Sequence, residues 1–446
     1  MPVPRDMPLC PAAPSQRSSG RTTRQYEISV VTPLFGGGVE AGAPDETLPI
    51  RGTSIRGQLQ FWWRATRGAG FAAREDLFAR HADVWGTTDK ASPVEIDIRD
   101  VTAAQARSCA RYEWNQKARG GQGGWRLTWE SPFAGSPLPY ALFPFQGKQP
   151  PSRQAAPEEA PAQFIETTSF TLRLRYPEAL QQDVATAVWA WVNFGGLGAR
   201  TRRGCGALLC KELALKDLSD LQQWFGTGSV KEAGNTRDWP TMPSKVLAGS
   251  KPEDPVDAWK KVIGLLQEFR QGVGIGRNSG QQNNRPGRSR YPEPETIRRV
   301  TGLRPAQHGR LAHIPDDAFP RAEFGLPIVF HFQGQGEPPD TVLYPSSATN
   351  GDPRERMASP LILKPLALAN GRAVPLILQL VTPPLAAVEL KQGSQSLGLP
   401  GTTMVQASRL ATYRDSPLAR SASGSAIEAF LLHARQSNNG FREVTR

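Results

Sequence analysis

The sequence is poor in the residues that most often bind metals or carry out catalysis. Four cysteines are present, far apart or at a spacing that does not suit metal ligands, and none forms a CxxC pair. This pattern argues against a zinc site and predicts reduced thiols in a cytosolic protein. The five histidines form no HxxxH, HExxH or HD motif. We therefore expect neither a metal ion nor another cofactor.

Long apolar runs are absent as well. The most apolar region, residues 361–390, is interrupted by Lys364, Arg372 and several prolines, so no segment is expected to span a membrane. Residues 1–24 are rich in Pro, Ser and Arg and lack an apolar run of signal-peptide length. This composition predicts a disordered N-terminal extension. Together these features predict a cytoplasmic protein without a membrane partner.

Acidic residues are outnumbered by basic ones. Lys and Arg total 53 against 41 Asp and Glu, which gives a formal net charge of +12. Arginine predominates, and its planar fork matches phosphate oxygens and stacks on bases, so the charge predicts a polyanionic partner. The basic residues are spread among loops and not along a basic amphipathic helix, which favours nucleic acid over a membrane surface. A length of 446 residues suggests two domains.

The first half of the chain alternates strands and helices in the order β-α-β-β-α-β, the ferredoxin-like (RRM-like) plan. The Pro/Ala/Gln-rich segment 147–163 is expected to be a mobile insertion. We predict a first domain over residues 25–240. Its expected elements are strand 25–32, helix 53–68, strand 93–101, a hairpin of 125–129 and 140–145, strand 168–176, a helix from Pro177 and a strand from Gly206.

The second half is compatible with a decorated copy of the same plan over residues 241–446. The predicted fold class is therefore α+β, with two ferredoxin-like domains in tandem and insertions between their elements. The expected elements are helix 256–271, strands 327–333, 361–366 and 374–382, and helix 426–434.

The segment 49–67 predicts a helix with one apolar face and arginines beside it. Thr53 and Ser54 are suitable N-cap residues, and the apolar residues after them recur at helical spacing. A helix N-terminus beside arginines can bind an anion. The alternative is an ordinary amphipathic helix with solvated arginines. The candidate RNA-binding residues here are Arg51, Arg56 and Arg64.

The glycine-rich loop 195–206 is a second candidate. Its glycines let the backbone approach a ligand, and its arginines supply positive charge. It lacks GK[ST] and follows a helix, so it is neither a Walker loop nor a dinucleotide fingerprint. The alternative is a helix C-cap with a glycine turn and exposed arginines. The candidate residues are Gly196, Gly198, Arg200, Arg202, Arg203 and Gly204.

The segment 272–310 is polar, rich in Gly and Arg, and contains few acids. Arginine concentrated in flexible sequence indicates contact with a phosphate backbone, because like charges without a partner repel. A solvated disordered loop is the alternative. The candidate RNA-binding residues are Arg277, Arg285, Arg288 and Arg290.

Seven sequence blocks, in order along the chain, are ISVVTPLFGGG (28–38), LPIRGTSIRGQLQFWWR (48–64), DVWGTTDKASPVEI (83–96), FGGLGARTRRGCGAL (194–208), RPGRSRYPEPETIR (285–298), EFGLPIVF (323–330) and ERMASPLILKP (355–365). Together they resemble the RAMP superfamily and, within it, the family of first subunits of the type III-B CRISPR Cmr effector complex. The N-terminal extension and the 147–163 insertion depart from the family pattern but touch none of these blocks.

The resemblance implies a non-catalytic subunit with two ferredoxin-like domains. Such subunits sit at the filament end that holds the 3′ portion of the guide RNA, beside other RAMP subunits. They cap the filament and help engage target single-stranded RNA in antiviral defence, while other subunits cleave the target. The resemblance places the candidate arginines against RNA or a neighbouring subunit, and leaves open which.

Two further functions stay open at the sequence level. The first is a RAMP-type endoribonuclease that processes precursor guide RNA, for which His308 or His313 would be the general base. The second is a scaffold whose basic patches meet acidic protein neighbours.

Overall fold

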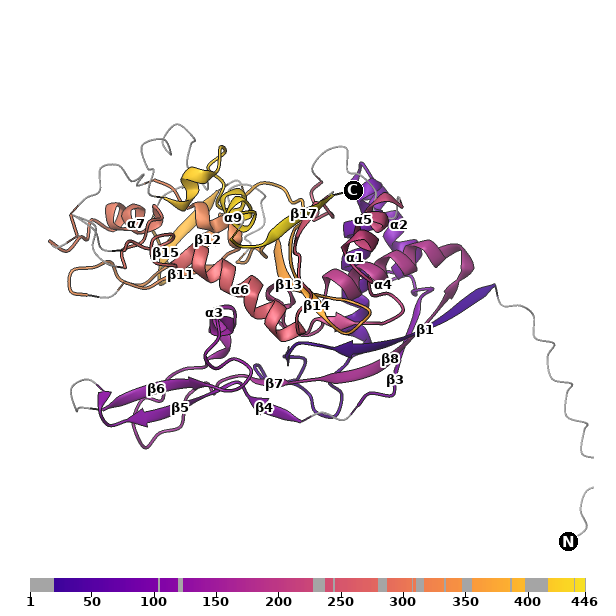
Figure 1. The fold of residues 1–446 in the computed structure, drawn as a ribbon, viewed down its shortest axis with the longest axis horizontal. Coiled ribbons are helices and arrows are strands. Elements are labelled where there is room, and N and C mark those ends of the chain that lie inside the picture. The colour runs from indigo at the N-terminus through magenta and orange to yellow at the C-terminus, as the bar shows by residue number, and fades with distance from the viewer. Residues whose placement is uncertain are drawn as a thin grey trace, which may run out of the picture.

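The structure is a computed structural model in which two four-stranded sheets and their helices form the body of the molecule (Figure 1). The residues that it describes are 20–102, 105–118, 123–227, 237–243, 245–279, 287–306, 308–309, 317–332, 334–346, 355–385, 387–397, 416–436 and 438–445.

The first sheet has the strand order β3-β8-β1-β9, and all its pairings are antiparallel. Its long strand β8 alternates between buried and half-buried side chains because one face packs on helices and the other does not. The helices are α1 and α4, which also pack on each other. The bounds are β1 Arg21–Val30, α1 Gly52–Thr66, β3 Glu95–Arg99, β8 Thr168–Pro177, α4 Gln181–Phe194 and β9 Leu208–Leu209.

The second sheet has the order β13-β14-β10-β17, again with antiparallel pairings. Its elements follow each other along the chain as strand, helix, two strands, helix and strand, and α6 and α9 lie on one face. The bounds are β10 Lys245–Gly249, α6 Pro255–Gln271, β13 Leu361–Ala367, β14 Ala373–Gln379, α9 Ala426–Ala434 and β17 Phe441–Thr445.

The two units share one apolar core. All seven residues of β13 are buried, because helices cover both faces of the second sheet. Ile362 and Leu366 face the core that contains α1 and α4, whereas Leu361 and Leu363 pack in the core of α6 and α9. The layers therefore run from the first sheet through α1 and α4 to the second sheet and then to α6 and α9.

A smaller four-stranded sheet, β11-β12-β15-β16, lies at the far end of α6 beside α7 and has its own core (Figure 1). The sequence patterns did not predict α7 or most of this sheet. The bounds are α7 Glu293–Thr301, β11 Ile328–Phe330, β12 Thr341–Pro345, β15 Val388–Gln392 and β16 Gln395–Ser396.

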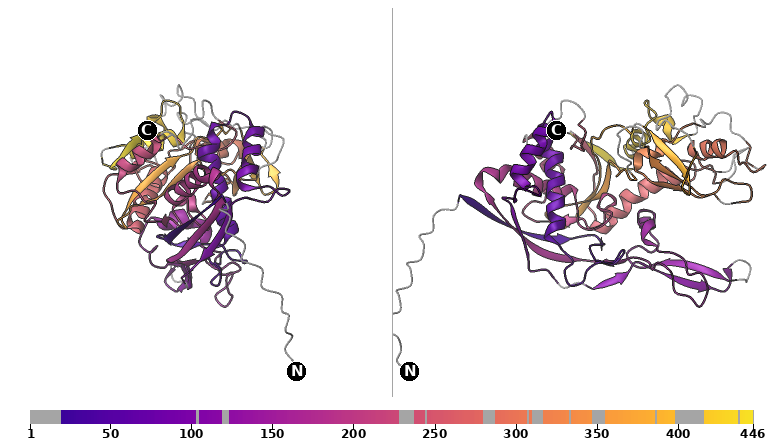
Figure 2. Two further views of the ribbon diagram at one scale, coloured as in Figure 1. Left: turned by 90° about the vertical axis from the view of Figure 1, so that its right-hand side faces the viewer. Right: turned by 180° about the vertical axis from the view of Figure 1, so that it is seen from behind.

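The hairpin of β5 and β6 projects from the body at the same end of the molecule, as Figure 1 and the right panel of Figure 2 show. The three-stranded sheet β2-β7-β4 connects it to the first unit, and α3 packs on α6. The bounds are β2 Leu34–Phe35, β4 Ala106–Ser108, β5 Ala110–Asn115, β6 Gly124–Trp129, α3 Leu138–Leu142 and β7 Gln163–Ile165. Two other helices are α2 Arg74–Trp85 and α5 Leu218–Gly226.

Several local predictions need correction. Residues 140–145 were expected to pair with 125–129, but they form the end of α3 and a 3-10 turn, and β6 pairs with β5.

Residues 21–24, assigned to the extension, are the start of β1, while 1–19 lie outside the described residues. The insertion 147–163 has no helix or strand before β7 and contains the bond from Lys148 N–H to Glu159 O (2.8 Å). Its mobility stays a prediction.

Among the described residues, no helix combines the length and the apolar character that crossing a membrane requires.

Candidate nucleic-acid interface

Helix α1 begins directly after Arg51, which adopts an extended conformation at the N-cap. Thr53 and Ser54 lie inside the first turn and do not cap the helix, contrary to the sequence prediction. The Arg51 guanidinium donates to Asp45 Oδ2 over 3.1 Å. Part of its charge is therefore compensated, and it is a weaker candidate for phosphate binding than the arginines further along α1.

Arg56 and Arg64 have neutral partners. Arg56 donates to Ser92 Oγ (2.8 Å) and to Val94 O (3.0 Å), and Arg64 lies 3.3 Å from His81 Nε2. Partial burial lowers the pKa of both guanidinium groups. Burial and the neighbouring Arg64 also lower the pKa of His81, so this partner stays neutral near pH 7. These two arginines therefore keep their positive charge uncompensated at the surface of α1.

The glycines of the glycine-rich loop are needed for packing. A Cβ atom at Gly204 would lie 2.5 Å from the indole of Trp259 in α6, and one at Gly198 would lie 2.3 Å from Phe35 O. A Cβ at Gly196 would lie 2.7 Å from Gly206 O. The loop thus approaches protein backbone and a tryptophan closely. The structure favours the packing role of these glycines over a cradle for a ligand.

The loop joins the two units. The Trp259 indole N–H donates to Arg203 O over 2.6 Å, and Arg203 donates to Leu361 O (2.9 Å) and Phe324 O (3.2 Å). Arg202 donates to Ser359 O. Both arginines therefore hold the second unit, and we call the glycine-rich loop 195–206 and its partners on α1, α6 and β13 the junction.

The junction carries several positive charges whose hydrogen-bond partners are carbonyl groups. Burial, followed by repulsion from Arg200 and Arg270, lowers the pKa of Arg203 to about 9. Burial also lowers the pKa of Arg200 and of Arg202. The Arg200 Nε atom is buried without a hydrogen-bond partner among the described residues. The junction is therefore a region of positive potential, which attracts polyanions.

Lys364 contributes a further buried charge to the junction. Its side chain is 1% exposed, and its ammonium group donates to Asn193 O (2.9 Å) and Gly195 O (2.7 Å) at the C-terminal end of α4. These carbonyls lie at the negative end of the helix dipole. Burial nevertheless lowers the pKa of Lys364 to about 7. Lys364 thus ties β13 to the helix that precedes the glycine-rich loop.

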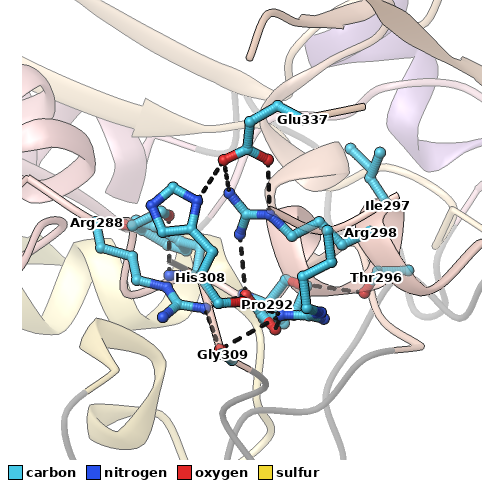
Figure 3. Close-up of polar contacts among 12 residues, drawn as sticks. Arg288, Pro292, Thr296, Ile297, Arg298, His308, Gly309 and Glu337 are labelled. Carbon is cyan, nitrogen blue, oxygen red and sulfur yellow. Dashed lines mark hydrogen bonds and ion pairs between the residues drawn. The ribbon is translucent and has the colours of Figure 1, made fainter. Parts of the chain in front are cut away.

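The Arg/Gly-rich segment 272–310 differs from the prediction because its arginines have internal carboxylate partners (Figure 3). Glu295, 4% exposed, accepts from Arg288 (2.6 Å), Arg298 (3.0 Å) and Arg304 (2.8 Å). Arg298 also pairs with Glu337 at 2.8 Å. The Arg288 guanidinium is therefore part of a buried ion network around α7, and the structure gives it a structural role.

The remaining candidates of this segment are placed differently. Arg277 is exposed, and its backbone pairs with Ser289. Arg290 donates to the carbonyls of Gly274 and Ile275. Arg285 lies outside the described residues.

Of the two histidines considered as a general base for RNA cleavage, the structure describes only His308. His308 Nδ1 contacts Glu337 Oε1 inside the ion network of Figure 3, and its side chain is largely buried. His313 lies outside the described residues. His331 Nδ1 lies 2.6 Å from Asp340 Oδ1 in an exposed pair.

Residues 27–209 match the family model described as the RAMP superfamily. This segment belongs to the RAMP superfamily. Over 190 residues the chain is 24% identical to the CRISPR system Cmr subunit Cmr1-2 of Pyrococcus furiosus, an alignment that covers 41% of this chain and 92% of that protein. The RAMP segment contains α1 and the glycine-rich loop, and it confirms the resemblance indicated by the motifs.

Two solved structures are also similar to this chain. Cmr1 from Pyrococcus furiosus in its apo form has 16% sequence identity and a TM-score of 0.42, with 82% of this chain and 89% of that chain covered. A chain of the Type III-B Cmr-beta complex bound to cognate target RNA has 11% identity and a TM-score of 0.43, with 80% and 94% covered.

The sequence analysis did not identify the roles of three residues in or near the RAMP segment. Lys364 is a lysine in the middle of the apolar run LILKPLA, which is a usable signal because lysine is rarely buried without a partner. Phe61 lies on α1 outside the fully buried apolar face, so an aromatic on the polar side of the helix was its signal. Trp259 had no signal for its contact with the loop, since only the tertiary arrangement of α6 creates it.

Proposed function

We propose that this chain is a non-catalytic, RNA-binding RAMP subunit of a type III-B CRISPR Cmr complex. In this role it caps the filament at the 3′ end of the guide RNA, beside other RAMP subunits, and helps engage target RNA. The observation that carries the proposal is the RAMP match of residues 27–209, together with the relative whose name is CRISPR system Cmr subunit Cmr1-2.

The RNA-facing surface that we propose is the exposed side of α1 together with the junction. Arg56 and Arg64 support it because their contacts are neutral, and Arg200 supports it because it has no ion pair with a carboxylate among the described residues. Guanidinium groups without carboxylate partners are available for phosphate oxygens. Arg51, Arg277 and Arg290 are secondary candidates, and Arg203 and Arg288 act structurally.

The domain organisation that we propose is two ferredoxin-like domains in tandem, over residues 25–240 and 241–446. Both four-stranded sheets support it, since in each the strands occur in the spatial order second, third, first and fourth along their β-α-β-β-α-β unit. The third sheet and the β5–β6 hairpin are decorations of this plan. The two domains meet at the junction.

The first test is a titration of labelled single-stranded RNA with the purified full chain, followed by a denaturing gel with and without Mg²⁺. Binding that weakens with salt, with intact RNA in every lane, is expected for an RNA-gripping subunit. Cleaved RNA would overturn the non-catalytic assignment, and His308→Ala and His313→Ala would then separate endoribonuclease activity from contamination. Weak RNA binding combined with tight association with other RAMP subunits would support the scaffold instead.

A further inference from the structure

A cavity of about 170 Å³ opens at the junction, between α1 and the glycine-rich loop. A cavity of roughly 150 Å³ is large enough to hold one benzene ring. The space is therefore suited to a single ring system and not to a peptide. Its lining residues are Gln58, Phe61, Trp62, Phe194, Gly195, Thr201, Arg202 and Ile362.

Flat apolar groups form much of the wall. Phe61 and Trp62 meet edge to face, with ring centroids 5.3 Å apart, and the Phe194 ring lies 6.1 Å from that of Trp62. The Arg202 guanidinium stands over the Phe61 ring, 5.5 Å from its centroid. Aromatic faces and a guanidinium plane are the surfaces on which bases stack.

The cavity also offers hydrogen-bonding groups. Gln58 supplies an amide and Thr201 a hydroxyl group. The Trp62 indole N–H is buried without a hydrogen-bond partner among the described residues. It lies beside Gly195, where a Cβ atom would stand 2.5 Å from it, and both residues line the cavity. The indole nitrogen has almost no accessible surface, so it belongs to the packed wall, and Gln58 and Thr201 supply the polar groups of the lining.

We propose that this cavity receives one unpaired nucleobase of the single-stranded RNA that crosses α1. The inference rests on the proposed RNA-binding function and adds a base-specific contact to it. A base is planar, fits the volume, and carries donor and acceptor atoms for the Gln58 amide and the Thr201 hydroxyl group. Its phosphates would remain outside the cavity. Gly195 itself is required by packing, because a Cβ atom there would lie 2.5 Å from Trp62 Nε1 and 2.6 Å from Trp191 O.

The test uses hexauridylate that carries 2-aminopurine at each position in turn, and the full chain as wild type and as two variants. Gln58→Phe fills the cavity, and Gln60→Phe is the matched control on the same helix, because Gln60 does not line it. We expect at least one 2-aminopurine position to be shielded from acrylamide quenching by the wild type and by Gln60→Phe. Gln58→Phe should lose this shielding and bind about tenfold more weakly. A urea unfolding curve checks that each variant is folded.

The outcomes separate the two proposals. RNA binding with no shielded position in the wild type would overturn the base cavity and leave the RNA-binding function intact. Shielding that survives in folded Gln58→Phe would also overturn it, because the base would then be held elsewhere. Absence of RNA binding by the wild type would overturn the proposed function and the cavity together.

Discussion

Gly204 shows how little space the junction leaves for a side chain. Its φ of +87° lies in the left-handed region, and the Trp259 indole occupies the position where a Cβ would stand. The same indole donates to the neighbouring Arg203 O. One residue thus fixes both the turn of the loop and the approach of α6, and hence the distance between the two units.

We predict that Gly204→Ala destabilises the protein by on the order of 2 kcal/mol, because both the backbone conformation and the contact with Trp259 become strained. Urea unfolding measures this. Gly57 is the control, since it lies in α1 with open space around its Cα, and Gly57→Ala should stabilise the protein by about 0.5–1 kcal/mol. Equal midpoints for Gly204→Ala and wild type would contradict the packing role.

Lys364 makes the stability of the folded protein depend on pH. Its pKa is about 7 in the folded state, whereas lysine in an unfolded chain titrates near about 10.4. Between these values the unfolded chain binds the additional proton, so the contribution of Lys364 to stability rises with pH. The opposite sign would hold only if folding raised its pKa.

We predict that Lys364→Met removes this rise. The free energy of unfolding of the wild type should increase between about pH 7 and about pH 8.5 more than that of the variant, measured by urea unfolding at both pH values. The unfolded cysteines titrate near about pH 8.5, but they are the same in both proteins and cancel from the comparison. Identical pH slopes for the two proteins would show that Lys364 is protonated in the folded state.

At the scale of single elements, α7 is held by its carboxylates. Burial raises the pKa of Glu295, but hydrogen bonds from Arg288 and Arg304 outweigh this and lower it. A carboxylate whose pKa falls on folding stabilises the protein above its unfolded pKa, and this contribution is lost as the pH falls. The ion network therefore needs an ionised Glu295.

We predict that Glu295→Gln destabilises the protein by on the order of 3 kcal/mol at neutral pH, because buried guanidinium groups lose their counter-charge. Its unfolding midpoint should also depend less on acid below about pH 5 than that of the wild type. Glu113→Gln is a suitable control, since that exposed carboxylate pairs with Arg111 at the surface. A loss no larger than that of the control would contradict the structural role of the network.

A helix or strand could be predicted from the sequence where neighbouring residues determine it, and a contact between residues far apart in the sequence could not. The apolar face of α1 and the full extent of α9 could be predicted because helical spacing is a property of consecutive residues. The role of Arg298 could not, because its partner Glu337 is 39 residues away. The arginines of 272–310 were interpreted as free charges, since a sequence does not show which carboxylates folding brings to them.

At the scale of the whole molecule, the sequence indicated the two units but not how they meet. The apolar run of β13 is explained by helices on both faces of the second sheet, which also places Lys364 and the glycine-rich loop in one junction. Arg202 and Arg203, which the sequence predicted to bind RNA, hold the second unit through its backbone carbonyls. The positive charges that remain uncompensated are those of Arg56 and Arg64 on α1.

The most direct test of this account compares the salt dependence of RNA binding in two charge-matched double variants. Arg56→Gln/Arg64→Gln removes the uncompensated charges of α1, and Arg99→Gln/Arg111→Gln removes the same number of charges that are paired with carboxylates. Labelled single-stranded RNA is titrated between roughly 50 and 200 mM salt, and the slope of log K against log salt is compared. We predict that the slope of the α1 variant becomes shallower by about 1.4 while that of the control is unchanged. Equal slopes for the two variants would contradict the claim that α1 holds the phosphates of the RNA.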